Sequence, residues 1–291
     1  MKKIKIYFFS GTGNTKKAAN LFKNEFEAKG VVTKITEIKK DVCDFDTEDC
    51  DAVGIFYPVH AFNAPYVVLD FARKLQKTHD KPLFIVKTSG EPVRLNNISS
   101  LKLISVLKRR GYDYFAEYHY VMPYNMIFRH GDKTAFRMWD TMKKLVPVDA
   151  SEVLEKTPRK PRKIPFGGVI ALLFRIEHPA MRVNGRFFKV DYEKCVGCGK
   201  CVRNCPMNNI VYENGKFRFN GDCACCVACS FNCPENAISI ALLNGWKVNG
   251  PYNFDNPCGE DDGRHSRYCK KAYDRYFREA EIKTALQKLD N

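Results

Sequence analysis

Cysteines at a repeated spacing are the clearest chemical signal in the sequence. Nine of the thirteen cysteines lie between Cys195 and Cys233. Within this stretch, residues 195–206 and 223–234 both read C-x2-C-x2-C-x3-C-P. Three thiolates at this spacing turn inward around one iron–sulfur cluster, whereas the fourth cysteine, before proline, leaves the loop and reaches a second cluster. The repeat therefore predicts two [4Fe–4S] clusters.

The predicted ligands cross over between the two runs. The first cluster takes Cys195, Cys198, Cys201 and Cys233. The second cluster takes Cys223, Cys226, Cys229 and Cys205. Zinc is the alternative, but it needs only one or two C-x2-C pairs and not two four-cysteine runs that each end in Cys-Pro. Cys225 departs from the pattern and is interpreted as a small buried side chain, or as a ligand in a shifted register.

A second chemical signal lies near the N-terminus, in the run Ser10, Gly11, Thr12, Gly13, Asn14 and Thr15. Glycines permit a tight turn, and the free amides of a helix N-terminus together with three hydroxyls suit a phosphate monoester. A nucleoside-triphosphate loop would need GxxxxGK[ST], which is absent here. A dinucleotide fingerprint would need a third glycine where Lys16 stands, although Glu37 keeps that alternative open.

Alternating strand and helix patterns position this loop. Apolar or alternating runs predict strands over residues 3–9, 31–38, 52–57, 83–87 and 112–121. Helical periodicity predicts helices over residues 14–29, 65–76, 98–110 and 134–145. Strands that alternate with helices predict an open α/β parallel sheet, covered by helices on both faces.

The loop at residues 10–15 resembles the phosphate loop of the flavodoxin family, and the resemblance covers residues 1 to about 150. It implies a doubly wound sheet of strand order 2-1-3-4-5, with FMN at the carboxyl ends of the strands. It also implies that two further loops hold the flavin ring. These loops contain Tyr57, Pro58, Val59 and His60, and then Thr88, Ser89, Gly90 and Glu91.

The second of these loops departs from the flavodoxin pattern of Gly, Asp and a stacking Tyr. The stacking residue is therefore open, with Tyr57, His60 and Phe62 as candidates, each of which can instead pack in the core. Tyr124 and Asn125, just beyond the fifth strand, are also expected to approach the flavin.

Residues 187–243 resemble the bacterial two-cluster ferredoxins, which implies a small α+β domain. The two parts together resemble flavodoxin–ferredoxin fusion proteins of anaerobic bacteria. The expected organisation is a flavodoxin-like domain (1–155), a connection (156–186), a ferredoxin domain (187–243) and a C-terminal loop and helix (244–291). We expect the apolar run 164–174 to pack between the domains, with a membrane or partner contact as the alternative, and helix 264–289 to pack on one domain or across the interface.

The formal net charge is +15, and the excess of basic residues peaks at residues 156–163. This run is interpreted as a docking face for an acidic redox partner; nucleic acid is a less favoured partner, and a solvated linker is the alternative. No apolar stretch is long enough for a spanning helix. The sequence thus predicts a soluble, cytoplasmic protein that works in a reducing cell.

We therefore expect an electron-transfer protein that passes electrons between the clusters and FMN. The alternative is an FMN-dependent reductase of a small organic substrate, although no acid/base pair stands out. A redox-responsive module whose basic region 156–163 binds nucleic acid or an anionic surface is a third hypothesis. The remaining cysteines, Cys43, Cys50, Cys258 and Cys269, have no motif context and are expected to be ordinary thiols.

Overall fold

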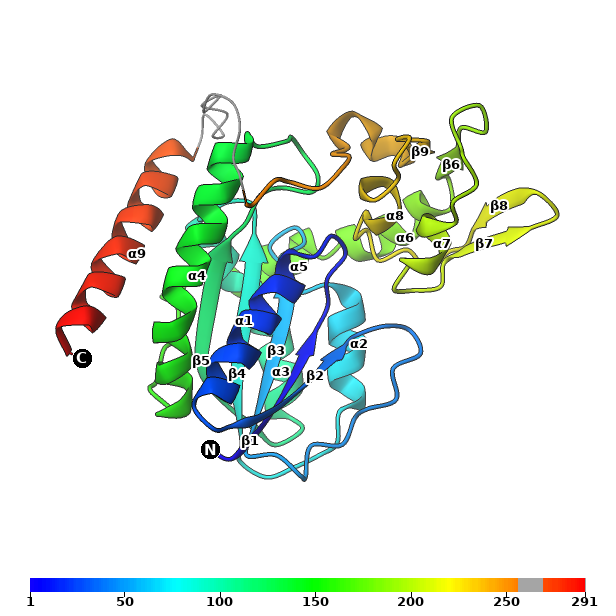
Figure 1. The fold of residues 1–291 in the computed structure, drawn as a ribbon. Coiled ribbons are helices and arrows are strands. Elements are labelled where there is room, and N and C mark those ends of the chain that lie inside the picture. The colour runs from blue at the N-terminus through cyan, green and yellow to red at the C-terminus, as the bar shows by residue number, and fades with distance from the viewer. Residues whose placement is uncertain (256–268, 291) are drawn as a thin grey trace.

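A five-stranded parallel sheet forms the N-terminal part of the protein (Figure 1). The computed structural model describes residues 1–255 and 269–290. The strands are β1 (Lys3–Phe8), β2 (Val32–Glu37), β3 (Ala52–Pro58), β4 (Lys81–Ser89) and β5 (Tyr112–Val121). Their order is β2-β1-β3-β4-β5, and every neighbouring pair is parallel. The flavodoxin-like topology predicted from the sequence is confirmed.

Helices cover both faces of this sheet because its strands are apolar on both sides. One face packs against α1 (Asn14–Ala28) and α4 (Asp132–Leu154), and the other against α2 (Tyr66–Lys74) and α3 (Leu101–Lys108), which follows the short helix η1 (Arg94–Ile98). Helix α4 is longer than the periodicity predicted and continues past Pro147. The described C-terminal helix, α9 (Lys270–Asp290), packs on α4. Cys258 and the predicted helix start at 264–268 lie outside the described residues.

The cysteine-rich part folds as a small α+β unit beside the carboxyl end of the sheet (Figure 1). Its strands pair in two antiparallel ladders, β6 (Lys189–Val190) with β9 (Ile238–Ser239) and β7 (Ile210–Glu213) with β8 (Lys216–Phe219). Its short helices are α7 (Lys200–Arg203), α8 (Ala228–Phe231) and η2 (Ala241–Trp246). A strand thus follows each cysteine run, β7 after the first and β9 after the second.

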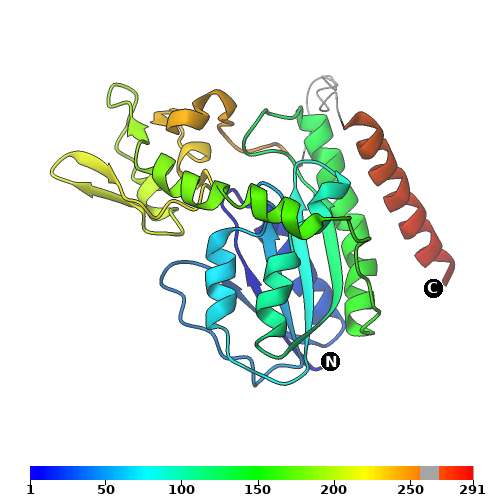
Figure 2. The same cartoon turned by 180° about the vertical axis from the view of Figure 1, so that it is seen from behind.

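The connection between the two parts contains two helices, α5 (Gly167–Phe174) and α6 (Glu177–Gly185), which lie end to end in Figure 2. The expectation that the apolar run 164–174 packs between the domains needs correction. One side of α5 packs on the first domain, where the Phe174 ring lies 4.9 Å from that of Phe62. Leu172 and Leu173, on the other side, are exposed, because no described element covers them. Among the described residues, no helix is long and apolar enough to cross a membrane.

Hydrogen bonds from separate elements fix the cysteine-rich unit to the sheet. The amide of Lys40, after β2, donates to the Pro206 carbonyl at 2.9 Å. The Tyr66 hydroxyl donates to the Asp222 carbonyl at 3.0 Å. The Arg129 guanidinium, in the loop after β5, donates to backbone carbonyls at residues 249–251. One anchor lies after β2, one lies in α2 and one lies after β5. The unit is therefore held across the carboxyl edge of the sheet.

A buried ion pair lies beneath the loop that follows β4. Lys87 and Glu117 are both 1% exposed and pair across β4 and β5. The Lys87 ammonium also donates to the Asn96 carbonyl at 2.7 Å. The Asn96 amide in turn donates to the Ser89 hydroxyl at 3.0 Å and to the Glu91 carbonyl at 2.7 Å. The ion pair therefore supports the backbone of residues 88–91.

We expect Glu117→Gln to lower the free energy of unfolding by about 3–5 kcal/mol, because it leaves the Lys87 charge buried without its carboxylate. Urea unfolding measures this change. Asp140→Asn, which removes an exposed partner of two lysines, is the matched control and should change stability by less than about 0.5 kcal/mol. Equal effects of the two substitutions would contradict the role given to the buried pair.

Candidate functional site

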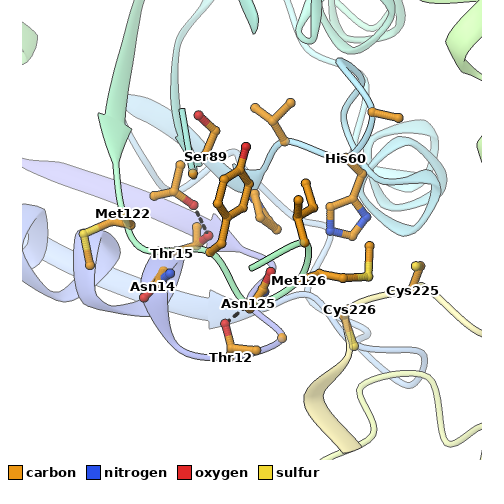
Figure 3. A pocket seen from close by; sticks show the side chains of 18 of the residues that line it. Thr12, Asn14, Thr15, His60, Ser89, Met122, Asn125, Met126, Cys225 and Cys226 are labelled. Carbon is orange, nitrogen blue, oxygen red and sulfur yellow. Dashed lines mark hydrogen bonds between the residues drawn. The ribbon is translucent and has the colours of Figure 1, made fainter. Parts of the chain in front are cut away.

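A pocket of about 300 Å³ opens at the carboxyl edge of the sheet (Figure 3). Loops that follow β1, β3, β4 and β5 form one side of it. Ligands of open α/β sheets bind at this edge, where the strand order reverses. The first and third strands flank that reversal here, since β1 has β2 on one side and β3 on the other. The pocket therefore lies where the predicted loops converge.

The loop at residues 10–15 is ordered by its own hydrogen bonds. The Ser10 hydroxyl accepts from the Gly13 amide at 3.1 Å, and Gly13 adopts a left-handed conformation with φ of 101°. The Thr12 hydroxyl accepts from the Asn125 side chain at 3.0 Å. The buried Thr15 hydroxyl lies 2.8 Å from that of Thr88 (Figure 3). Hydroxyls from the start of α1 and the end of β4 thus meet at one end of the pocket.

The same end of the pocket favours an anion. Helix α1 begins at Asn14, so the unpaired amides of its first turn face the loop and carry the positive end of the helix dipole. The Asn14 side chain is turned away to donate to the Pro123 carbonyl at 2.9 Å. Backbone amides at a helix N-terminus, flanked by hydroxyls, fit a phosphate group.

Of the residues predicted for the ring loops, Pro58, Val59, His60, Thr88, Ser89 and Gly90 line the pocket. Burial, followed by the charge of His178, lowers the pKa of His60 to about 4. The imidazole is therefore neutral at pH 7. Tyr124 and Asn125 also line the pocket, as expected from their place beyond β5. A Cβ atom on Gly90 would lie 2.3 Å from the Tyr124 ring, so this glycine lets the ring approach the backbone.

The predictions for Tyr57, Glu91 and Phe62 need correction, because none of these residues lines the pocket. The Tyr57 side chain is fully buried in the core, and its hydroxyl lies 3.2 Å from that of Ser99. The alternation of side chains along β3 points it away from the pocket. The Glu91 carboxylate accepts from the Cys269 thiol on the side of α9. The Phe62 ring packs against α5 instead.

The opposite wall of the pocket was missed from the sequence. It consists of Met126 and Ile127 from the β5 loop, Glu177 and Met181 from α6, Cys225 and Cys226 from the second cysteine run, and Leu243 and Trp246 from η2. Figure 3 shows His60 and Met126 beside Cys225 and Cys226. No local pattern relates these segments, which are distant in sequence, so only the docking of the two parts brings them together.

The phosphate-type loop and the second cysteine run are in direct contact. A Cβ atom on Gly11 would lie 2.3 Å from the Cys226 carbonyl oxygen and 2.7 Å from the Cys226 Cβ. Such approaches are too close for any side chain, so the backbone contact requires glycine. At α6, Gly185 packs equally closely, since its Cβ would lie 2.1 Å from that of Cys223. Two glycines thus seat the second run between the sheet edge and α6.

Cysteines from both runs lie close together in the structure. Cys195, Cys198, Cys201 and Cys233 line one small cavity. In the other set, burial and then the neighbouring thiols Cys223 and Cys205 raise the pKa of Cys226 to about 12. Within the described ranges, no three His, Cys, Asp or Glu side chains converge as the ligands of one ion would. The first set instead surrounds a common space, which fits a multi-iron cluster.

The two runs share their backbone conformation as well as their spacing. Gly197 and Gly199 have φ of 66° and 65°, and the equivalent Cys225 and Val227 both have φ of 51°. The last cysteine of each run also accepts an amide hydrogen bond from four residues later, Cys205 at 3.3 Å and Cys233 at 3.2 Å. Cys225 is therefore the structural counterpart of a glycine and not of a cluster ligand.

Comparison with known proteins agrees with this description of the cysteine-rich part. Residues 187–210 match the family described as a 4Fe-4S binding domain. An uncharacterized ferredoxin of Methanocaldococcus jannaschii is 41% identical over 59 residues, which are 19% of this chain and 77% of that protein. The pyruvate synthase subunit PorD of the same organism is 44% identical over 52 residues, which are 17% of this chain and 60% of that protein.

The N-terminal part is similar to solved flavodoxins. A short-chain flavodoxin associated with a bacterial microcompartment is 17% identical, with a TM-score of 0.41, and the match covers 53% of this chain and 98% of that one. The flavodoxin-like assignment does not depend on this match, because the strand order β2-β1-β3-β4-β5 carries it.

We expect Gly11→Ala to lower the free energy of unfolding by about 1–3 kcal/mol, because the added methyl overlaps the backbone of Cys226. The measurement is chemical denaturation of the full chain under anaerobic conditions. Gly168→Ala is the matched control, since no atom lies within 4 Å of its Cβ position. If both variants were as stable as the wild type, the contact between the two parts would be looser than described.

Proposed function

The cysteine-rich part of this chain belongs to the ferredoxin family, and from that premise we propose a cytoplasmic electron-transfer protein that passes electrons between two [4Fe–4S] clusters and FMN. One observation carries the proposal. The loop at residues 10–15 and Cys226 line the same pocket and touch at Gly11. A group bound by that loop would therefore be the immediate neighbour of a group bound by the second cysteine set.

The residues divide into those that would hold each group. Amides and hydroxyls of residues 10–15 would bind the FMN phosphate, and the loops at 58–61, 88–90 and 122–127 would enclose its ring. The clusters would be held by Cys195, Cys198, Cys201 and Cys233, and by Cys223, Cys226, Cys229 and Cys205. When bound, FMN exchanges one or two electrons and the clusters exchange electrons singly. We assign residues 1–155 and 187–243 to the two cofactor-binding domains.

The two cysteine sets differ in burial, and this difference supports a path for electrons between the surface of the molecule and the pocket. Cys198 and its neighbour Val196 are exposed, whereas Cys229 is buried. The first set therefore faces solvent and would meet a partner protein, while the second set faces the pocket. Exposed Lys194, Lys200 and Arg203 lie around the first run. Their charge favours an acidic redox partner at this set.

The pocket walls would exclude water from the flavin. Met126, Leu243 and Trp246 are apolar, and His60 is neutral at pH 7 because burial lowers its pKa to about 4. Water exclusion strengthens the hydrogen bonds that hold an anionic phosphate, and it limits side reactions of a reduced cofactor.

Reduction of a small organic acceptor is a second candidate, and Glu177 favours it. This side chain lines the pocket, its Oε2 atom is buried without a hydrogen-bond partner in the described structure, and burial raises its pKa to about 7. A carboxyl group with this pKa can donate a proton at neutral pH.

Anaerobic reconstitution tests the main proposal. We expect the purified chain to retain FMN together with about eight iron atoms, since each cluster holds four. Cys205→Ser and Cys233→Ser should each lose about half of the iron. Only Cys205→Ser should also alter the flavin absorbance, because its set includes Cys226 in the pocket wall. Cys43→Ser, an exposed thiol outside both runs, is the control and should change neither signal. Iron retained without flavin would overturn the proposal.

A panel of small quinones and nitroaromatic compounds tests the second candidate. If the pocket reduces them, Glu177→Gln should slow turnover by about tenfold or more while leaving bound flavin unchanged. The wild-type rate should fall as the pH rises above about 7, because the raised pKa keeps the proton on Glu177 only below that value. Met181→Leu, a neutral change in the same helix and wall, serves as the control. No turnover above that of free FMN would remove this candidate.

A further inference from the structure

The outer side of α5 and α6 is an exposed apolar ridge. The inner side of this helical segment is covered: Ala171 is buried, and a Cβ on Gly167 would lie 2.8 Å from Ile98. The outer side carries apolar side chains that are between 55% and 83% exposed, namely Phe166, Val169, Leu172, Leu173, Ile176, Val183 and Phe187. We call these residues the apolar ridge. Monomeric proteins rarely expose a continuous apolar surface of this kind without a function.

Basic residues surround the ridge almost without acidic ones. Residues 156–190 contain nine lysines and arginines, and Glu177 is their one acidic residue. Glu177 does not offset this charge on the outer surface, because it lines the pocket on the inner side of α6. Lys160, Arg162 and Lys163 are exposed directly before the ridge begins. The face is therefore both apolar and strongly cationic.

A cationic cleft of about 210 Å³ adjoins the ridge. Its lining includes Arg73, Lys102, Arg175 and Arg182, with Asp70 as the one acidic side chain. Asp70 pairs with Arg73 and, at 3.9 Å, with Arg182. The Nε atom of Arg175 is buried and has no hydrogen-bond partner in the part of the chain that the structure describes. The Arg175 side chain lines the cleft, and guanidinium groups bind phosphate well.

We infer that the ridge and the cleft bind the surface of an anionic lipid bilayer, with the ridge in the acyl boundary and the cationic residues at the headgroups. Helices that lie in the membrane interface have this combination of an apolar side and flanking lysine and arginine. Basic residues near an anionic surface and apolar groups buried in the acyl boundary both strengthen such binding.

Charge and composition favour a bilayer over a protein partner. A symmetric dimer through this face would bring the same basic residues of two copies together, because an isologous interface pairs a surface with itself. Stable protein interfaces are enriched in aromatic residues, Met and Arg and depleted in Lys. Five of the seven ridge residues are aliphatic Val, Leu or Ile, and lysines precede the ridge. An anionic bilayer has no defined shape, and it matches both the basic charge and the aliphatic composition of this face.

Flotation of the full chain with vesicles tests the inference. The vesicles contain phosphatidylcholine alone, or phosphatidylcholine with one quarter phosphatidylglycerol. We expect binding only to the anionic vesicles, and weaker binding as the salt concentration rises. The double substitution Leu172→Gln and Leu173→Gln should lower the partition coefficient by about tenfold or more. Arg175→Gln should lower it less, since it removes one headgroup contact.

Ile282→Gln with Leu286→Gln is the matched control, because these two aliphatic side chains of α9 are exposed to a similar degree. This control should float like the wild type, and all variants should keep the same circular dichroism spectrum. Equal binding of wild type to neutral and anionic vesicles, or no binding to either, would overturn the inference. A dimer in analytical ultracentrifugation that the Leu172/Leu173 variant abolishes would also overturn it, since a second copy would then cover the ridge.

Discussion

The backbone contact between Gly11 and Cys226 is the constraint on which the site depends. It joins the sheet to the cysteine-rich part, whose Met207 and Ala224 also pack in the core on one face of the sheet. Electron transfer slows steeply as donor and acceptor move apart. Direct contact between the two loops would therefore favour fast transfer between the groups that they bind. The hydrogen bonds of Lys40, Tyr66 and Arg129 maintain this contact, because they hold the small unit against relative motion at three places.

The two cysteine runs have the same backbone but different surroundings. The first run uses glycine at both left-handed positions, whereas the second uses Cys225 and Val227. A β-branched residue at positive φ is strained and persists only where its surroundings favour it. Both side chains are buried here, and Cys225 forms part of the pocket wall. The second run thus accepts backbone strain at two positions whose side chains are buried, and one of these side chains lies in the pocket wall.

The inner and outer sides of helices α5 and α6 have different surroundings. Their inner side contributes Glu177 and Met181 to the pocket and seats Cys223 against Gly185. Their outer side carries the apolar ridge. A surface that binds the ridge would therefore lie one helix away from the pocket. Only the thickness of this segment would separate that surface from a group bound in the pocket.

Local sequence was sufficient for predictions that depend on the spacing of residues along the chain. The C-x2-C-x2-C-x3-C-P runs predict two crossed cysteine sets as cluster ligands, because short turns dictate where neighbouring thiols point. The alternating strand and helix patterns predicted the parallel sheet, the resemblance to flavodoxins implied its strand order, and Ser10–Thr15 predicted the phosphate-type loop at a helix N-terminus. Side chains that docking or sheet alternation positions were not predictable in this way. Tyr57 lies in the core, Glu91 faces α9, and Cys226, Glu177 and Trp246 complete the pocket from distant segments, because their positions depend on contacts that no local pattern encodes.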